Sequence, residues 1–200
     1  GGVPLGRRTG VLDGLTARSV AGDGGRSMEL AVRHLVSLGH TRIALAVGPD
    51  RLTPAAQKRE GFITAMKTNL GPRVEHRILT SLFTVEGGGA SARTLLREGT
   101  TAIICGSDLM ALGAMRAVRS AGLRVPQDVS IIGFDDSIFM NFTDPPLSTL
   151  RQPIDAMSQA VVDLLLEAMA GSTPVSTELR FSPELIVRGS TAPPPVRGAS

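Results

Sequence analysis

The sequence predicts a doubly wound α/β fold, in which helices cover both faces of a mostly parallel sheet. Helical and extended patterns alternate along the chain from Gly24 onward. The extended segments, such as "TTAIICG" and "DVSIIGF", are apolar throughout instead of alternating, as expected for parallel strands that are buried on both faces. With 200 residues, of which 42% are hydrophobic, the chain is long enough to form one or two lobes with cores of their own.

The first half of the chain predicts two helices and two strands ahead of a glycine run. In each helical segment apolar residues recur at helical spacing, and a glycine, Gly39 or Gly71, ends the pattern. The expected elements are a helix at 26–38, a strand at 42–47, a helix at 55–70 and a strand at 76–83. We interpret Gly87–Gly89 as a flexible loop before a helix at 90–98, because the lysine and hydroxyl of a phosphate-binding loop do not follow it.

The second half of the chain repeats this rhythm and then departs from it. The expected elements are a strand at 100–106, a helix at 108–122, a strand at 128–134, a proline-rich extended segment at 143–153 and an amphipathic helix at 155–171. Two short extended segments on either side of Ser182-Pro183 predict a β-hairpin. The last residues, "TAPPPVRGAS", are typical of a disordered tail.

Composition argues against several classes of protein. No apolar run is long enough to cross a bilayer, the first residues lack the apolar core of a secretory signal, and a single cysteine, Cys105, rules out an internal disulfide. We therefore expect a cytoplasmic protein that does not contact a membrane. The net charge of +3 comes from scattered basic residues, and Trp and Tyr are absent, so we expect these residues not to bind nucleic acid directly.

Polar residues follow three of the predicted strands, at the edge of the sheet where open α/β folds bind ligands. These residues are Gly48-Pro49-Asp50, Ser107-Asp108 and Asp135-Asp136. Asp108 stands where a helix begins, so an N-cap explains it equally well. Two adjacent acids on an extended backbone point to opposite sides. That arrangement suits one carboxylate that binds ligand hydroxyls beside a structural one better than it suits an acid–base pair.

Catalytic and metal-binding motifs are missing from the sequence. The histidines, His34, His40 and His76, lack metal-ligand spacing, and for each we expect a surface or loop position. No nucleophile elbow, Walker loop or dinucleotide fingerprint occurs. The sequence therefore predicts reversible binding of a small molecule, with no metal and no cofactor.

Several motifs together resemble one family. The run "TAIICGSDLMALGAMRAVRSAGLRVPQDVSIIGFDDS" is followed by "DPPLSTLRQP" and "LIVRGST" and preceded by "LVSLGHTRIALAVGP" and "KREGFITAM". This combination is similar to the effector-binding and dimerisation domain of the LacI/GalR (lactose-repressor/galactose-repressor) transcriptional regulators, and the resemblance covers about residues 2–191. It implies a type I periplasmic-binding-protein-like fold. Two α/β lobes are then joined by crossing segments, with a small-molecule effector, a sugar or related metabolite, between them.

The resemblance implies a nearly complete C-terminal lobe and a partial N-terminal lobe. The implied division is 1–23 for the partial N-terminal lobe, 24–145 for the C-terminal lobe, 146–172 for a return segment to the N-terminal lobe, 173–192 for a C-terminal-lobe hairpin and 193–200 for the tail. The helix-turn-helix headpiece, the hinge helix and the first strand–helix units of the family have no counterpart in this sequence. We therefore expect exposed apolar surface on the helix of the partial lobe.

The resemblance also implies effector-binding residues. Asp135 corresponds to an aspartate that accepts hydrogen bonds from sugar hydroxyls, and Phe83 to an aromatic that stacks on the ligand, although a buried loop anchor explains Phe83 equally well. Two positions depart from the family pattern, since Ser107 replaces an asparagine beside Asp108, and Lys58 replaces an arginine, a point charge in place of a planar fork. The other implied cleft residues are Gln152 and Ile154.

The family forms two-fold dimers, so the resemblance implies a homodimer that would suit a palindromic operator. Small residues in the helix expected at 108–122 would let a second helix approach closely, and core packing explains them as well. The implied interface residues are Met110, Ala114, Ala117 and Ala121.

The resemblance thus predicts a non-enzymatic domain whose effector controls operator binding by a headpiece missing from this chain. One alternative is an extracytoplasmic sugar-binding protein of a transporter, which shares the fold. Another is an α/β enzyme such as a ribose-processing hydrolase, against which the missing nucleophile and metal set argue. A helix-turn-helix in place of a signal peptide ahead of this sequence would identify the regulator.

Overall fold

The structure, a computed structural model, describes residues 20–22, 24–170 and 179–196. The chain divides into two compact units. The large unit comprises Gly24–Arg151 and Pro183–Ser200, and the small unit comprises Gly1–Asp23 and Gln152–Ser182. Among the described residues, no helix has the length and apolar character needed to cross a membrane.

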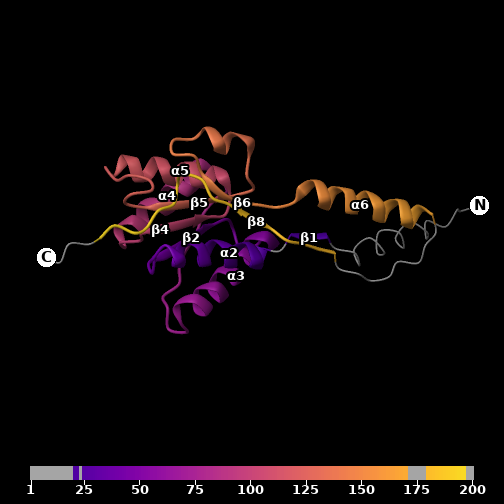
Figure 1. Ribbon diagram of the computed structural model, residues 1–200, viewed down its shortest axis with the longest axis horizontal. Helices are drawn as coiled ribbons and strands as arrows, with labels where there is room; N and C mark the ends of the chain where they lie inside the picture. Colours follow the sequence, from indigo (N-terminus) through magenta and orange to yellow (C-terminus); the bar gives the residue numbers. More distant parts are fainter. Residues whose placement is uncertain (1–19, 23, 171–178, 197–200) are drawn as a thin grey trace, which may run out of the picture. The chain divides into compact units, whose positions relative to one another are not determined.

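A six-stranded sheet forms the centre of the large unit (Figure 1). Its strand order is β3-β2-β4-β5-β6-β8, and the pairing is parallel except between β6 and β8. The strands are β2 (Ile43–Val47), β3 (Arg77–Thr80), β4 (Ala102–Cys105), β5 (Ser130–Phe134), β6 (Ser148–Arg151) and β8 (Glu184–Ile186). Every residue of β2, β4 and β5 is buried, which explains why these strands are apolar apart from Ser130 at the start of β5.

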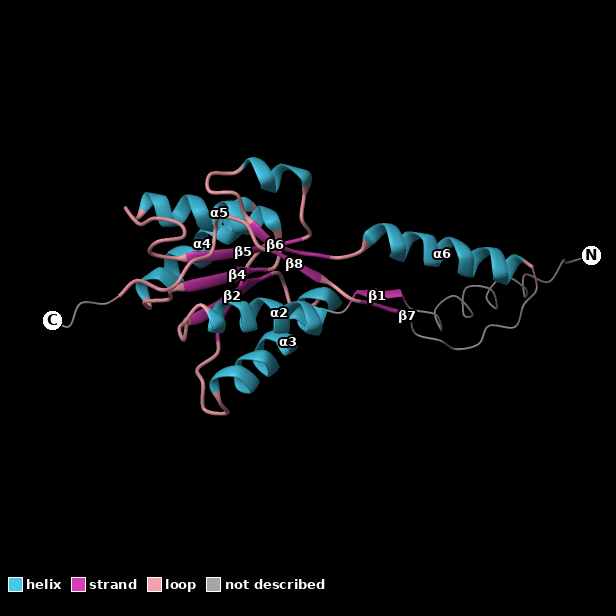
Figure 2. Ribbon diagram, in the orientation of Figure 1, coloured by secondary structure: helices cyan, strands magenta, loops and turns pink. Residues whose placement is uncertain are grey.

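Helices cover both faces of this sheet (Figure 2). The helices α2 (Gly24–Ser37) and α3 (Thr53–Leu70) pack on one face, and α4 (Val85–Arg97) and α5 (Asp108–Ser120) on the other. Each face has its own hydrophobic core, to which neighbouring strand residues contribute alternately, as Ile103 and Ile104 do. The doubly wound α/β fold predicted from the sequence is confirmed.

The glycine run lies inside a helix, where the sequence analysis placed a loop. Gly87, Gly88 and Gly89 lie near the N-terminus of α4, whose N-cap Thr84 accepts a hydrogen bond from the Gly87 amide at 3.0 Å. The helix α4 passes so close to α5 that a Cβ on Gly88 would lie 2.0 Å from the carbonyl oxygen of Met110. Gly88 therefore serves close helix packing, Gly87 lies against the backbone of Leu82, and the loop prediction was wrong.

The same packing buries most of the residues that the resemblance implied for a dimer interface. Met110, Ala114 and Ala117 are buried in the core that α4 and α5 form with the sheet. Because these side chains are enclosed within one chain, a second copy has no access to them. Their assignment to an interface was wrong, and core packing accounts for them. Ala121 follows α5 and is exposed, so its place in an interface stays a prediction.

The described part of the small unit consists of α6 (Ile154–Met169) and two short strands, β1 (Val20–Gly22) and β7 (Leu179–Phe181), which pair in parallel. From the sequence, a hairpin of β7 and β8 was expected within 173–192. Instead, β8 pairs with β6 in the large sheet, so the hairpin prediction was wrong. Both strands pair with strands distant in sequence, and local spacing carries no sign of such partners.

Several apolar side chains of α6 are exposed, as expected for the helix of the partial lobe, beside exposed polar residues such as Gln159 and Asp163. Its exposed apolar side chains are Ile154, Val161, Val162, Leu165, Leu166 and Met169. The sequence predictions for 1–19 and for the last residues of the tail, 197–200, lie outside the described residues.

Candidate functional site

A pocket of about 850 Å³ opens in the large unit beyond the carboxyl ends of β3, β4 and β5. Its lining residues are Lys58, Phe83, Gly106, Ser107, Asp108, Leu109, Leu112, Asp135, Ser137, Phe139 and Met140. Five residues that the sequence analysis singled out therefore come together here: Lys58, Phe83, Ser107, Asp108 and Asp135. The other two, Gln152 and Ile154, belong to the small unit, and their part in a cleft stays a prediction.

Lys58 brings a buried amine to the pocket from α3, with the whole residue 7% exposed. Its Nζ atom donates a hydrogen bond to the carbonyl oxygen of Gly106 at 2.8 Å. The same atom lies 3.6 Å from the centre of the Phe134 ring and 5.8 Å from that of Phe83. Burial lowers the pKa of Lys58, and the charge of Asp135 acts in the opposite direction. Further hydrogen bonds from this amine would be available to a ligand.

Asp135 follows β5 and supplies a carboxylate to the pocket while remaining exposed. Its backbone amide donates to the carbonyl oxygen of Leu150 at 2.8 Å, which ties the residue to β6. Desolvation raises the pKa of Asp135, and the neighbouring charge of Lys58 partly opposes this rise. Asp135 thus offers hydrogen-bond acceptors close to the Lys58 donor.

Asp108 lines the pocket, but both oxygens of its carboxylate accept hydrogen bonds from other residues of the protein. Its Oδ1 accepts a hydrogen bond from the Thr149 hydroxyl at 2.8 Å, and its Oδ2 accepts one from the Ser137 amide at 2.7 Å. Burial raises the pKa of Asp108, and these two hydrogen bonds oppose the rise. The N-cap of α5 is Ser107, whose hydroxyl accepts from the Met110 amide at 3.2 Å. The N-cap explanation of Asp108 was therefore wrong, because its carboxylate holds the segment after β5.

Phe83 combines the two explanations that the sequence left open. Its ring covers the backbone of Gly48 so closely that a Cβ there would lie 1.9 Å from a ring carbon, and it also contacts Gly106. The residue is half-buried and lines the pocket. An anchored ring of this kind gives the pocket a rigid apolar wall.

Much of the apolar lining of the pocket was not predicted from the sequence. Leu109 and Leu112 come from α5, and Phe139 and Met140 come from a short 3-10 helix, Ile138–Phe142, which had no sequence prediction. Phe139 is 71% exposed. The spacing of Leu109 and Leu112 was a usable sign, because residues three apart share one face of a helix. For the 3-10 helix, no periodic pattern was present.

Asp136 turns away from the pocket and forms ion pairs. Its carboxylate accepts hydrogen bonds from Arg188 at 2.7 Å and from Arg151 at 2.6 Å. Burial alone would raise the pKa of Asp136, but these arginines hold it below its ordinary value. The backbone is not extended here as the sequence analysis assumed, because Asp135 and Asp136 have φ angles of +103° and +55°. These left-handed conformations direct the two carboxylates to different surroundings.

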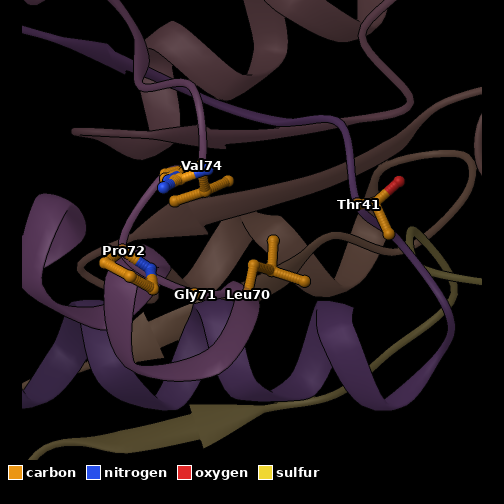
Figure 3. Close-up of a pocket in the computed structure, with 6 residues that line it drawn as sticks. Thr41, Leu70, Gly71, Pro72 and Val74 are labelled. Carbon is orange, nitrogen blue, oxygen red and sulfur yellow. The ribbon is translucent and has the colours of Figure 1, made fainter.

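A second pocket, of about 440 Å³, lies near the opposite ends of the strands (Figure 3). The residues that line it are Thr41, which precedes β2, and Leu70, Gly71, Pro72, Arg73 and Val74, which end α3 and form the turn after it. No carboxylate lines this pocket. Ligands of open α/β sheets bind beyond the carboxyl ends of the strands, so the pocket beside Asp135 is the better candidate.

Known proteins resemble this chain in sequence and in fold. The chain matches the model of the periplasmic binding protein-like domain over residues 32–191. It is 53% identical over 194 residues, 96% of this chain, to an uncharacterized HTH-type transcriptional regulator in the aml 5' region of Streptomyces limosus. It is 49% identical over 198 residues, 97% of this chain, to the HTH-type transcriptional regulator MalR of Streptomyces coelicolor. The chain spans 55% and 58% of the length of these two relatives.

A solved structure gives the same result at the level of the fold. A LacI family transcriptional regulator from Enterococcus faecium, with bound ribose, superposes with a TM-score of 0.79 and 32% sequence identity. The match covers 88% of this chain and 66% of that one.

Proposed function

Because the chain belongs to the LacI/GalR family of transcriptional regulators, as part of their periplasmic-binding-protein-like effector domain, we propose that it binds a sugar or a related polyhydroxylated metabolite beside Asp135. The similar proteins are transcriptional regulators, which confirms the expectation that this chain is not an enzyme. The regulator reading is thereby favoured over the transporter protein and the hydrolase.

The observation that carries the proposal is the meeting of Lys58 and Asp135 in one largely apolar pocket. The carboxylate accepts hydrogen bonds from ligand hydroxyls, and the amine donates to ligand oxygens. Phe83 and Phe139 supply flat apolar surface for the C–H faces of a sugar ring. A few convergent polar groups on an apolar lining are typical of small-molecule sites. The ribose in the Enterococcus faecium regulator supports the choice of ligand class.

We also propose, from the family to which the chain belongs, that the full protein regulates transcription by binding operator DNA. The relatives are HTH-type regulators of which this chain spans 55% and 58%, which supports a DNA-binding headpiece elsewhere in the full protein. We expect the effector to contact both units, with Gln152 and Ile154 in the small unit as further contacts. A cytoplasmic homodimer would then bind its operator according to which state the effector stabilises. Such control requires different effector affinities in the two states.

The test is a thermal-shift screen of the full-length regulator against mono- and disaccharides, followed by operator binding with each hit. A ligand that binds only the folded protein raises its melting temperature. We expect at least one sugar to raise it and to change operator affinity. A sugar that raises the melting temperature without any effect on operator binding would contradict the regulatory role. A panel with no sugar hit would contradict the ligand class.

A further inference from the structure

The carboxylate of Asp136 joins two segments that lie far apart in sequence. Arg188 donates to its Oδ1 at 2.7 Å and Arg151 donates to its Oδ2 at 2.6 Å. The side chains of Asp136 and Arg188 are 7% and 11% exposed, whereas that of Arg151 is 47% exposed. One arm of this cluster is therefore buried and the other lies at the surface.

Both arginines stand next to points where the chain passes between the two units. Arg151 is the last residue of β6 and of the first large-unit segment, which ends there. Arg188 follows β8, shortly after the chain re-enters the large unit at Pro183. The side chain of Arg188 also donates to the carbonyl oxygen of Leu147 at 2.8 Å, and its amide donates to the Ser148 hydroxyl at 2.9 Å. The two connecting segments are thus fastened to each other and to Asp136.

Asp136 directly follows Asp135, whose carboxylate lines the pocket. Asp135 and Asp136 both have positive φ angles, which are uncommon for residues other than glycine, although aspartate and asparagine adopt them more readily than most. The Asp135 amide donates to Leu150, and the Asp136 amide donates to the Thr149 hydroxyl at 3.3 Å. Both acceptors lie on β6, directly before Arg151. The turn that carries Asp135 is therefore built against the connecting segments.

We propose that Asp136 is a positioning residue that couples the pocket to the two connecting segments. Its ion pairs fix the left-handed turn and so direct the Asp135 carboxylate into the pocket. A shift of β6 or of the segment after β8 moves the arginines, and the turn moves with them. The proposed coupling does not depend on which ligand binds in the pocket. Its use in regulation rests on the proposed function.

Hydrogen exchange of the whole chain, followed by mass spectrometry, tests this coupling. D136N removes the charge but keeps a side chain that tolerates a left-handed backbone. The matched control is D128N, which removes the acid from the exposed Arg124–Asp128 pair, 3.0 Å in length. In D136N we expect exchange to rise about tenfold or more in 135–137, 147–151 and 185–190 together, because a buried charge pair is broken. D128N leaves these segments unchanged.

Background variants separate coupling from general destabilisation. In an R188Q background, D136N should add little exchange to 185–190 but still raise exchange in 147–151 through the loss of the Arg151 contact. An equal rise in α2 and α5 in D136N would show general loosening and would overturn the proposal. So would a response of only one connecting segment. If D136N does not fold, R151Q removes the exposed arm alone, and unchanged exchange at 135–137 and 147–151 in that variant would count against the coupling.

Discussion

The Nζ atom of Lys58 lies 3.6 Å from the centre of the Phe134 ring, so a buried ammonium from α3 rests on the last residue of β5. The same atom donates to the carbonyl oxygen of Gly106 at 2.8 Å. The cation–π contact and the hydrogen bond offset part of the cost of burying the charge. They keep the amine beside Asp135, where an arginine's larger planar group would need a different arrangement.

Replacing Lys58 by methionine should separate ligand binding from stability. We expect K58M to bind the effector about tenfold more weakly or worse, because a charged donor is lost. Its free energy of unfolding should stay within about 1 kcal/mol of the wild type or increase, because the cost of burying a charge is removed and the neighbouring Asp135 carboxylate is exposed to solvent. Titration calorimetry and urea unfolding measure the two effects. K67M, which alters an exposed lysine of the same helix, is the matched control.

The lowered pKa of Lys58 should affect how the stability of the protein depends on pH. Burial lowers the pKa of Lys58 in the folded state below its ordinary value of 10.5. The unfolded chain therefore holds the proton more tightly, which disfavours folding at neutral pH. This penalty disappears as the pH rises from the lowered pKa toward 10.5. The wild type should gain stability relative to K58M over that range. Parallel curves for the two proteins would contradict the assignment.

His40 should make the fold sensitive to mild acid. The residue is 1% exposed, and its ring nitrogens contact the Thr101 hydroxyl at 2.9 Å and the carbonyl oxygen of Ala192 at 2.8 Å. Burial lowers its pKa below the ordinary 6.5, although the Ala192 contact opposes this. Stability should therefore fall as the pH drops from 6.5 toward the lowered pKa. His34, whose pKa burial also lowers, contributes in the same direction.

Denaturant unfolding of the wild type and H40Q between pH 8 and pH 5 tests this prediction. The variant should be less stable at neutral pH, because buried hydrogen bonds are lost, and its stability should depend less on pH. An equally steep loss of stability in both proteins would assign the acid sensitivity to other groups.

Gly88 should tolerate no side chain. Helix propensity alone predicts that alanine in α4 stabilises the protein by about 1 kcal/mol. A Cβ at this position would instead lie 2.0 Å from the backbone oxygen of Met110. We therefore expect G88A to lower the free energy of unfolding by about 2–3 kcal/mol. The exposed Ala90 of the same helix gives the comparison, because A90G should cost only about 1 kcal/mol. A more stable G88A would contradict the close packing of α4 on α5.

Most helices and strands of the large unit could be predicted from the sequence, because their burial produces apolar patterns within each segment. The strand β4 is an unbroken apolar run, and Gly39 and Gly71 mark the ends of two helices with φ angles of +99° and +98°. The pairing of the last strands and the role of the glycine run could not be predicted in this way. The partners of β7 and β8 depend on strands distant in sequence, and Gly87–Gly89 look like a loop until the neighbouring helix is known.

The candidate site follows the same rule. Asp135 and Lys58 could be named from polar residues at strand ends and from the family motifs, and both line the pocket. Phe139 could not, because an apolar side chain in a short 3-10 helix leaves no periodic pattern. Different surroundings for Asp135 and Asp136 were predicted, but on the assumption that the backbone is extended there. The actual cause is a left-handed turn held by distant arginines.

Calorimetric titration of the full-length regulator and its D135N variant, with the sugar that the thermal-shift screen identifies, tests whether the Asp135 carboxylate binds the ligand. Asparagine keeps the size of the side chain and accepts the left-handed backbone, so the variant should fold. Loss of a charged acceptor of ligand hydroxyls should weaken binding about tenfold to a hundredfold. If D135N binds the same sugar with unchanged affinity, Asp135 does not hold the ligand and the proposed site is wrong.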